Sequence, residues 1–541
     1  MRMNLVPASA LLAMCLCRPA PAAEELGRVE FVTSCAAAER APFNRGVALL
    51  HDFWYDEAER QFAEILARDP GCAMAHWGKA MSFYHQIWNR PDKADLAKGL
   101  KELQAARASS AGTPRERVYI DSLYAFYAPN QKDYPARVNA YARQMARLHE
   151  TYPDDVDGTA FNALAVLAAE PTGDTSLEAE RQAEALLQPA FASHPDHPGV
   201  VHYLIHACDT PSLAGKGLAA ARSYGRIAPS GAHAAHMPAH IFARLGMWQE
   251  DIDANLTSVG DSQQAQRLHP MEGFDEFHAN EFLLYAYLQS GQEARARELI
   301  DVNTRMVDHA AAMPQMADGG MAGMFSYYRA EFPVFYYLEM RDWQRAQALP
   351  VDAVAKPESQ QLTVWARAIA AGHLRDAPAA RDELAHFDAL TEKMRQGDRP
   401  WIADSTGLQV ARAEALGWTA HASGDEAAAE IHLRQAADLQ DKVGQAEVDI
   451  PAREMLADLL LEAKRYPQAL IEYQSSLKMS PNRFNGLYNA GLAAEGAGDR
   501  AQAGEFYAQL MRMTAGGKDS ARVEFRHLKD FNGPTTAPRA P

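Results

Sequence analysis

Two short segments of the chain concentrate side chains that could bind a metal ion. In the segment HYLIHACD, His202, His206 and Asp209 stand at i, i+4 and i+7, which places them along one stripe of an α-helix. The segment GAHAAHMPAH has a similar helical spacing. Imidazole and carboxylate groups are ligands that zinc and copper accept in proteins. The two segments therefore predict a transition-metal site, to which the second segment would contribute His233, His236 and His240.

A hairpin of two helices would bring these stripes face to face. We expect four histidines to converge on one site that holds a transition metal, zinc or copper, and they are His202, His206, His236 and His240. Asp209 and His233 are expected either to bind the ion or to orient the residues that do. His278 is a further candidate, because the helix that carries it comes next in the chain and could pack against the same site.

The same histidines also fit a purely structural role. Helices of a repeat protein bury half-polar faces, and buried imidazoles can hydrogen-bond one another, a backbone carbonyl or Asp209. Without a cation, four clustered imidazoles would have to stay neutral, because several buried positive charges repel. The sequence leaves both interpretations open, so the protein is either a binding or scaffold module or a metal-dependent enzyme.

Methionines gather further along the chain, in the segment MVDHAAAMPQMADGGMAGM. Thioether sulfur is a ligand for Cu(I), and a histidine lies in the same segment. Methionine also fills gaps at adaptable surfaces, and the glycines of the segment suggest a flexible connection. The sequence does not decide between these two roles for Met306, Met313, Met316, Met321, Met324 and His309.

The elements that must position these residues show a repeat near the C-terminus. The segment AKRYPQALIEYQSSLKMSP is followed, 34 residues later, by GAGDRAQAGEFYAQLMRM. This spacing is the period of the tetratricopeptide repeat, a pair of antiparallel helices. The N-terminal segment FWYDEAERQFAEILARDP has the same pattern of aromatic, alanine and proline residues. The matching pairs of the C-terminal repeat are Tyr466 with Arg500, Ala469 with Ala503, and Tyr473 with Tyr507.

Helical periodicity is common elsewhere and strand-like alternation is scarce, which predicts an all-α fold. We expect a tetratricopeptide-like helical-repeat solenoid of antiparallel helix pairs. Its expected parts are a signal peptide (1–22), an N-terminal helical-repeat region with the histidine segments (23–300), an irregular methionine-rich connection with helices (301–355), C-terminal tetratricopeptide repeats (356–515) and a disordered tail (516–541).

Several segments resemble a family of exported bacterial tetratricopeptide-repeat proteins. The resemblance covers nearly all of the mature chain, and its most specific parts are HYLIHACD and HMPAHI, which match HYxIHxx[DE] and HMPxHI. It implies a helical-repeat fold, but the family has no assigned activity that could be transferred. Asp209 fits the acidic position of the first motif. FHANEF is similar to a divergent histidine–asparagine segment, and the methionine cluster is not part of the pattern.

The N-terminus predicts export. Arg2 precedes a short apolar stretch, and the small residues APA at 20–22 form a cleavage site for a signal peptidase. We therefore expect a periplasmic or secreted protein with no membrane span. Three cysteines remain after cleavage, and in an oxidising compartment the simplest outcome is a disulfide between Cys35 and Cys72 with Cys208 left free.

The charge of the chain limits its partners. Seventy acidic residues against 53 lysines and arginines give a formal net charge of −17. Such a surface repels phosphate backbones, so we expect no nucleic-acid partner. Helical-repeat proteins present concave grooves, and the expected partner is a protein, a peptide or a small molecule bound in such a groove.

Overall fold

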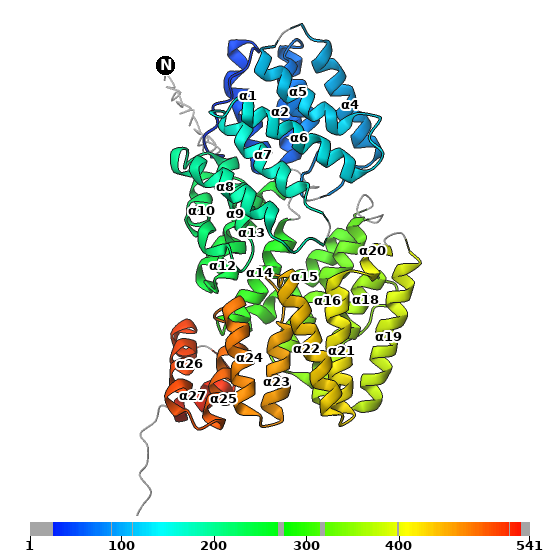
Figure 1. The fold of residues 1–541 in the computed structure, drawn as a ribbon, viewed down its shortest axis with the longest axis vertical. Coiled ribbons are helices and arrows are strands. Elements are labelled where there is room, and N and C mark those ends of the chain that lie inside the picture. Colours follow the sequence, from blue (N-terminus) through cyan, green and yellow to red (C-terminus); the bar gives the residue numbers. More distant parts are fainter. Residues whose placement is uncertain are drawn as a thin grey trace, which may run out of the picture.

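The structure is a computed structural model of the 541-residue chain, and it describes residues 25–531 apart from 88, 111, 172, 269–274, 314–319, 398–399 and 519. The expected signal peptide lies outside the described residues. Throughout the described part the chain is helical and contains no strand, in the arrangement of a tetratricopeptide-like solenoid of antiparallel helix pairs (Figure 1).

The helices follow one another closely along the chain. Those of the first half are α1 (Arg40–His51), α2 (Tyr55–Arg68), α3 (Ala73–Met81), α4 (Lys93–Ala108), α5 (Pro114–Tyr127), α6 (Tyr134–Thr151), α7 (Val156–Ala168), α8 (Glu178–Ser193), α9 (Pro198–Cys208), α10 (Ala214–Ile227), α11 (Ala232–His236), α12 (Pro238–Arg244), α13 (Trp248–Leu268) and α14 (Asp275–Gln289). Those of the second half are α15 (Glu293–Ala311), α16 (Gly320–Glu339), α17 (Trp343–Gln347), α18 (Pro357–His373), α19 (Ala377–Arg395), α20 (Pro400–Ala403), α21 (Thr406–Ala422), α22 (Glu426–Val443), α23 (Ala452–Glu462), α24 (Tyr466–Met479), α25 (Phe484–Gly496), α26 (Arg500–Met513) and α27 (Glu524–Phe531).

Small residues against aromatic rings let successive helices pack closely. The ring of Phe62 on α2 lies between Gly46 on α1 and Gly78 on α3. A Cβ atom on Gly46 would lie 2.7 Å from this ring, and one on Gly78 would lie 2.4 Å from it, so neither position has room for a larger residue. The 34-residue spacing of the sequence is confirmed at the other end of the chain, where α24 begins at Tyr466 and α26 begins at Arg500.

The helices enclose two large hydrophobic cores that meet at α12. The first core extends from Leu26 to Phe242, and the second extends from Ala239 to Ala493. The short helix α12 contributes to both, because Ile241 packs into the first core and Ala243 into the second. In Figure 1 the N-terminal helices form one lobe, the C-terminal helices form another, and α12 and α14 lie between them. The histidine segments of α11 and α12 lie at this junction.

The structure differs from two of the expected boundaries. Helix α15 runs through residue 300, so no break separates 23–300 from 301–355. The expected disordered tail of 516–541 contains helix α27 within its described part. The reason is that EFRHLKDF is amphipathic: Phe525 and Leu528, three residues apart, are buried in a small core with Phe484.

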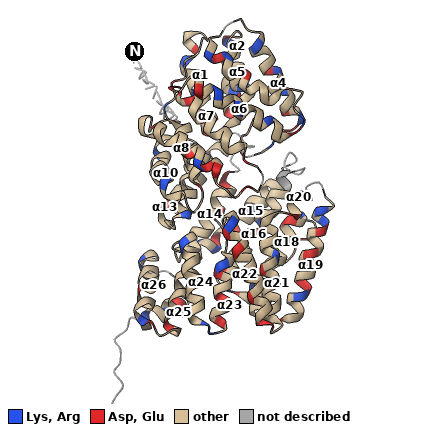
Figure 2. Ribbon diagram, viewed as in Figure 1, with Lys and Arg blue, Asp and Glu red and all other residues tan. Residues whose placement is uncertain are grey.

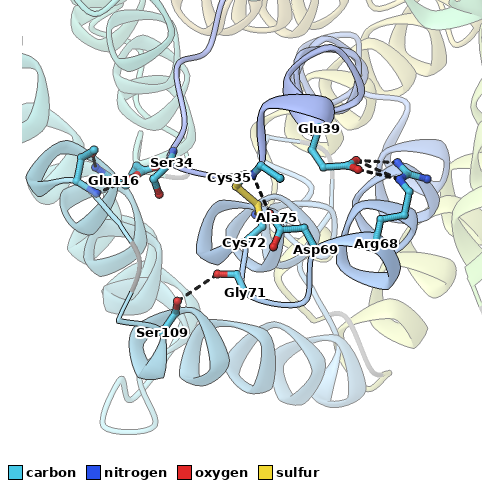
Figure 3. The surroundings of a disulfide bond; sticks show 12 residues. Ser34, Cys35, Glu39, Arg68, Asp69, Gly71, Cys72, Ala75, Ser109 and Glu116 are labelled. Atoms are coloured by element: carbon cyan, nitrogen blue, oxygen red, sulfur yellow. Dashed lines mark hydrogen bonds and ion pairs between the residues drawn. A yellow bond between two sulfur atoms is a disulfide. The ribbon is translucent and has the colours of Figure 1, made fainter.

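Cys35 and Cys72 form a disulfide (Figure 3). Cys208 is a buried free thiol. The bond links the segment before α1 to the start of α3. Hydrogen bonds hold the same segment in place, because the Ala36 amide donates to the Asp69 carboxylate at 2.8 Å. The N-terminal end of the first core is thereby fixed to the turn between α2 and α3.

Replacing both bridged cysteines by serine is expected to destabilise the first core by roughly 3–4 kcal/mol, because the bond closes a loop across 37 residues. Denaturant unfolding of the Cys35→Ser/Cys72→Ser chain, beside a Cys208→Ser control, measures this loss. Peptide mapping without reductant tests the pairing directly, and recovery of Cys208 in a disulfide would contradict it.

The surface carries both signs of charge. Figure 2 shows basic and acidic residues intermixed along the outer helices, as on α19, where Arg381 and Asp382 are neighbours. Among the described residues, no helix combines the length and the apolar character needed to cross a membrane.

Candidate metal centre

Four helices supply the histidines, and prolines determine where two of these helices begin. Pro198 occupies the first turn of α9, and Pro238 occupies the first turn of α12. A proline lacks a backbone N–H and its ring clashes with the preceding helical turn, so α11 ends at His236 and a new helix starts after Met237. Across this break His236 on α11 meets His240 on α12, whereas His233, three residues before His236, contacts His202 on α9.

His202, His206 and His233 form the first histidine group. His202 Nε2 lies 3.1 Å from His206 Nε2 and 3.2 Å from His233 Nε2. Three nitrogens bound tetrahedrally to zinc at roughly 2.0–2.1 Å would lie about 3.3 Å apart. The two distances from His202 Nε2 are thus close to those around one ion, and one nitrogen from each of the three residues lies within 4.8 Å of the others.

The Nε2 atom of His202 has two nitrogen neighbours in this group. His202 is fully buried, and its Nδ1 donates to the carbonyl oxygen of His51 at 2.6 Å. Burial, and then the neighbouring His206, hold the pKa of His202 well below its usual value, so the ring is neutral and its Nε2 carries one lone pair. That single lone pair faces two nitrogens at hydrogen-bond distance. A cation bound by all three nitrogens would resolve the conflict.

His236, His240 and His278 form the second histidine group. His236 Nε2 lies 3.0 Å from His240 Nε2, and the ring of His278 lies 4.5 Å from that of His236, measured between centroids. One ring nitrogen from each of the three residues lies within 4.8 Å of the others. The two groups adjoin, because the ring centroids of His233 and His236 are 6.5 Å apart.

Each imidazole of the second group has an oxygen partner on Nδ1, which leaves Nε2 for the common point. His236 Nδ1 donates to Asn255 Oδ1 at 2.6 Å. The amide of Asn255 is itself oriented, because its nitrogen donates to Asp251. His278 Nδ1 lies 2.9 Å from a carboxylate oxygen of Glu281. Such outer partners fix the ring orientation of metal-binding histidines and increase their basicity.

His240 has the most strongly charged surroundings. Its Nδ1 lies 2.9 Å from Asp209 and 3.4 Å from Glu447, and Arg244 bridges both carboxylates. Burial lowers the pKa of His240, but the charges of Asp209 and Glu447 outweigh it and raise the pKa to about 10. Burial acts to raise the pKa of Asp209, whereas Arg244 and His240 hold it well below its usual value. A metal ion on His240 Nε2 would therefore displace a proton.

One phenylalanine lies against all three rings of each group. Phe53 has its ring centroid 4.5, 5.7 and 5.4 Å from those of His202, His206 and His233. Phe282 is 4.8, 4.9 and 5.2 Å from the rings of His236, His240 and His278. Phe53 has a left-handed backbone, with φ of +59°, in the turn between α1 and α2. An apolar wall of this kind limits the access of water to the nitrogens.

The structure distributes the candidate residues differently from the expectation of one shared site. His202 and His206 meet His233, whereas His236 and His240 meet His278 in a separate group. Asp209 lies beside His240 and belongs to its outer partners. Several outer partners were not predicted from the sequence: the His51 carbonyl, Phe53, Asn255 and Glu447, which lie outside the histidine segments, and Glu281 and Phe282, which follow His278 by three and four residues.

The methionine segment is only partly described. Met306 and Met313 line a cavity of about 410 Å³ with His309, and with Met324 they pack around Phe277. Met316 and the side chain of Met321 lie outside the described residues. The described thioethers fill space beside an aromatic ring, and copper binding there stays a prediction.

Replacing Asn255 by leucine is expected to weaken binding of a metal ion at the second group by about 10–100-fold, because the Nδ1–H of His236 loses its acceptor. Competition with a chromophoric chelator measures the affinity. The control is Gln249→Leu, the same type of change at an exposed amide on α13. Equal affinities for the two variants would contradict an orienting role for Asn255.

Comparisons with known proteins identify no family for this chain. No protein-family model matches the chain, and no curated protein matches it. Among solved structures, the human IFIT1 dimer with m7Gppp-AAAA is similar at 12% identity and a TM-score of 0.36, covering 82% of this chain and 90% of that chain. The human IFIT1 dimer with PPP-AAAA is similar at 10% identity and a TM-score of 0.36, covering 82% of this chain and 91% of that chain. At these TM-scores the likeness supports no conclusion about this chain, and we assign neither a fold nor a ligand from it.

Proposed function

We propose that this protein is an exported helical-repeat scaffold that binds two transition-metal ions, zinc or copper, one in each histidine group. The observation that carries the proposal is that, in each group, one ring nitrogen from each of three histidines lies within 4.8 Å of the others, with neighbouring Nε2 atoms as close as 3.0–3.2 Å. In the first group, the nitrogens of His206 and His233 compete for the one lone pair of His202 Nε2, which a cation would relieve. An all-imidazole set suits zinc and copper better than the oxygen-seeking ions magnesium and calcium.

Export supports the same proposal. The disulfide between Cys35 and Cys72 is of the kind that persists in oxidising compartments, and a signal peptide at 1–22 would deliver the chain there. In the periplasm or outside the cell, the histidines would not compete with cytosolic thiols for zinc or copper. The intact mass of the protein recovered from the envelope should correspond to a chain that begins near Ala23, and a retained N-terminus would contradict export.

Metal analysis tests the proposal directly. Protein purified from the native envelope without chelators should hold close to two equivalents of zinc or copper per chain, measured by mass spectrometry of the elements. The chelator-treated protein should regain both equivalents on titration. A chain that arrives without stoichiometric metal and takes up neither zinc nor copper would overturn the proposal and would leave the histidines a structural role.

A metal-dependent enzyme is the second candidate function. The observation that favours it is the number of ligands, because three imidazoles leave one position of a four-coordinate ion for water or a substrate. Structural zinc sites usually have all four positions filled by the protein. Absorption spectra of the cobalt-substituted chain that change on adding azide would support an open position.

A further inference from the structure

A cavity of about 450 Å³ adjoins the first histidine group. It lies among the loop between α3 and α4, the start of α6, the loop between α7 and α8, and helix α9. Of the three histidines in the group, His206 is the one that lines the cavity, whereas His202 and His233 are buried behind it. A molecule in this cavity would reach an ion of the first group from the side of His206.

Two carboxyl groups face each other across part of the cavity wall. Glu170 follows α7 and Glu180 lies in the first turn of α8. Burial, and then the nearby charges of Glu180 and Asp174, raise the pKa of Glu170 to about 7. Glu170 also shares a side-chain hydrogen bond with Glu180, and the buried Oε2 atom of Glu180 has no further partner in the described part of the chain. The two carboxyl groups thus share a proton, and their remaining lone pairs can accept hydrogen bonds from a ligand.

The arginine that lines the cavity contacts an aromatic ring. Arg90 also lines the cavity, but its guanidinium carbon lies 4.8 Å from the centroid of the Tyr134 ring, in a cation–π contact. An ammonium group carried by a ligand would donate to the remaining oxygen lone pairs of Glu170 and Glu180 and would offset their charge. Charge-assisted hydrogen bonds of this type are among the stronger polar contacts in proteins.

We propose that this cavity binds a small molecule that carries a primary ammonium group and an oxygen-donor group, the ammonium at Glu170 and Glu180 and the oxygen donor on the ion of the first histidine group. The inference rests on the proposed metal site and adds the class of ligand that the site takes. Its two anchors are independent of each other, because the carboxyl pair comes from the loop after α7 and from α8, whereas the metal ligands come from α9 and α11.

Two hydroxamates that differ by one ammonium group test the assignment. Glycine hydroxamate and acetohydroxamate both chelate metal through oxygen, and only the first carries an ammonium. We expect the zinc-loaded chain to bind glycine hydroxamate about tenfold more tightly, as measured by calorimetry, because the ammonium gains hydrogen bonds to charged acceptors. The Glu180→Gln chain should lose this preference and keep its zinc. Glu178→Gln, the same change at an exposed position of α8, should retain both.

The outcomes separate the two proposals. Equal binding of the hydroxamates by a chain that holds zinc would overturn the ligand assignment and leave the metal site intact. A preference that persists in Glu180→Gln would place the ammonium elsewhere and would also overturn it. A chain that takes up no zinc would overturn both proposals. Zinc content measured before and after each titration shows whether a hydroxamate binds the site or removes its ion.

Discussion

Replacing His206 by alanine is expected to reduce the metal content from two ions to one. His206 supplies one of three nitrogens to the first group, and the loss of a direct ligand should cost more than the 10–100-fold typical of an outer partner. His278→Ala should remove the other ion for the same reason, and the double variant should hold neither. Elemental analysis after dialysis, with circular dichroism as a check of folding, measures these outcomes.

His206 and His278 suit the experiment because each is the most accessible histidine of its group, so replacing its side chain by alanine disturbs the hydrophobic core least. The side chain of His278 is 38% exposed, whereas His202 and His236 are buried. His194→Ala removes an exposed histidine near α9 and should keep both ions. If either single variant lost both ions, the two groups would have to be treated as one site; if both variants kept two, the imidazoles would not be ligands.

Acid is expected to destabilise the metal-free protein sharply between pH 6.5 and 4. Burial lowers the pKa of His51 to about 4 and that of His206 to about 3, against about 6.5 in the unfolded chain. In this interval the unfolded chain binds more protons, so stability falls as the pH falls, by about 1.4 kcal/mol per pH unit for each imidazole. By pH 4 each of these two residues accounts for a loss of about 3 kcal/mol.

His240 behaves in the opposite way and does not offset this loss. Its pKa is raised to about 10, so it is protonated in both states below pH 6.5, and the stability that it contributes is lost only as the pH rises toward 10. Denaturant midpoints of chelator-treated protein at several pH values give the profile. His206→Asn should make the slope shallower by one proton, and a profile that stays level from pH 7 to 4.5 would refute the burial of neutral imidazoles.

The periodicity of the sequence was sufficient to predict the helices. The 34-residue interval between Tyr466 and Arg500 reappears as the starts of α24 and α26, because a repeat unit fixes both the helix length and the small residues at the contacts. The pairing of His202 with His206 also follows from helix geometry alone, since residues four apart share a face. The spacing of residues along the chain therefore predicts the helices and the pairs of residues that share a helix face.

The grouping of the histidines needed tertiary information. His233 and His236 lie three residues apart on the same short helix, α11, yet they belong to different groups, and the partner of His236 in its group, His240, lies on the separate helix α12. The outer partners come from far along the chain: the His51 carbonyl is 151 residues from His202, and Glu447 is 207 residues from His240. No local pattern encodes such contacts.

The position of the histidine groups at the meeting of the two hydrophobic cores affects how the whole chain unfolds. Long repeat arrays lose cooperativity because each part contacts only its neighbours. Ligands for the second group lie on α11, α12 and α14, and Glu447, from the loop between α22 and α23, contacts His240 on α12. Ions bound there would stabilise only the state in which both lobes are folded and docked. Metal would then act as a thermodynamic coupler: calorimetric scans of the loaded chain would merge into one transition, and chelation would let the lobes melt separately.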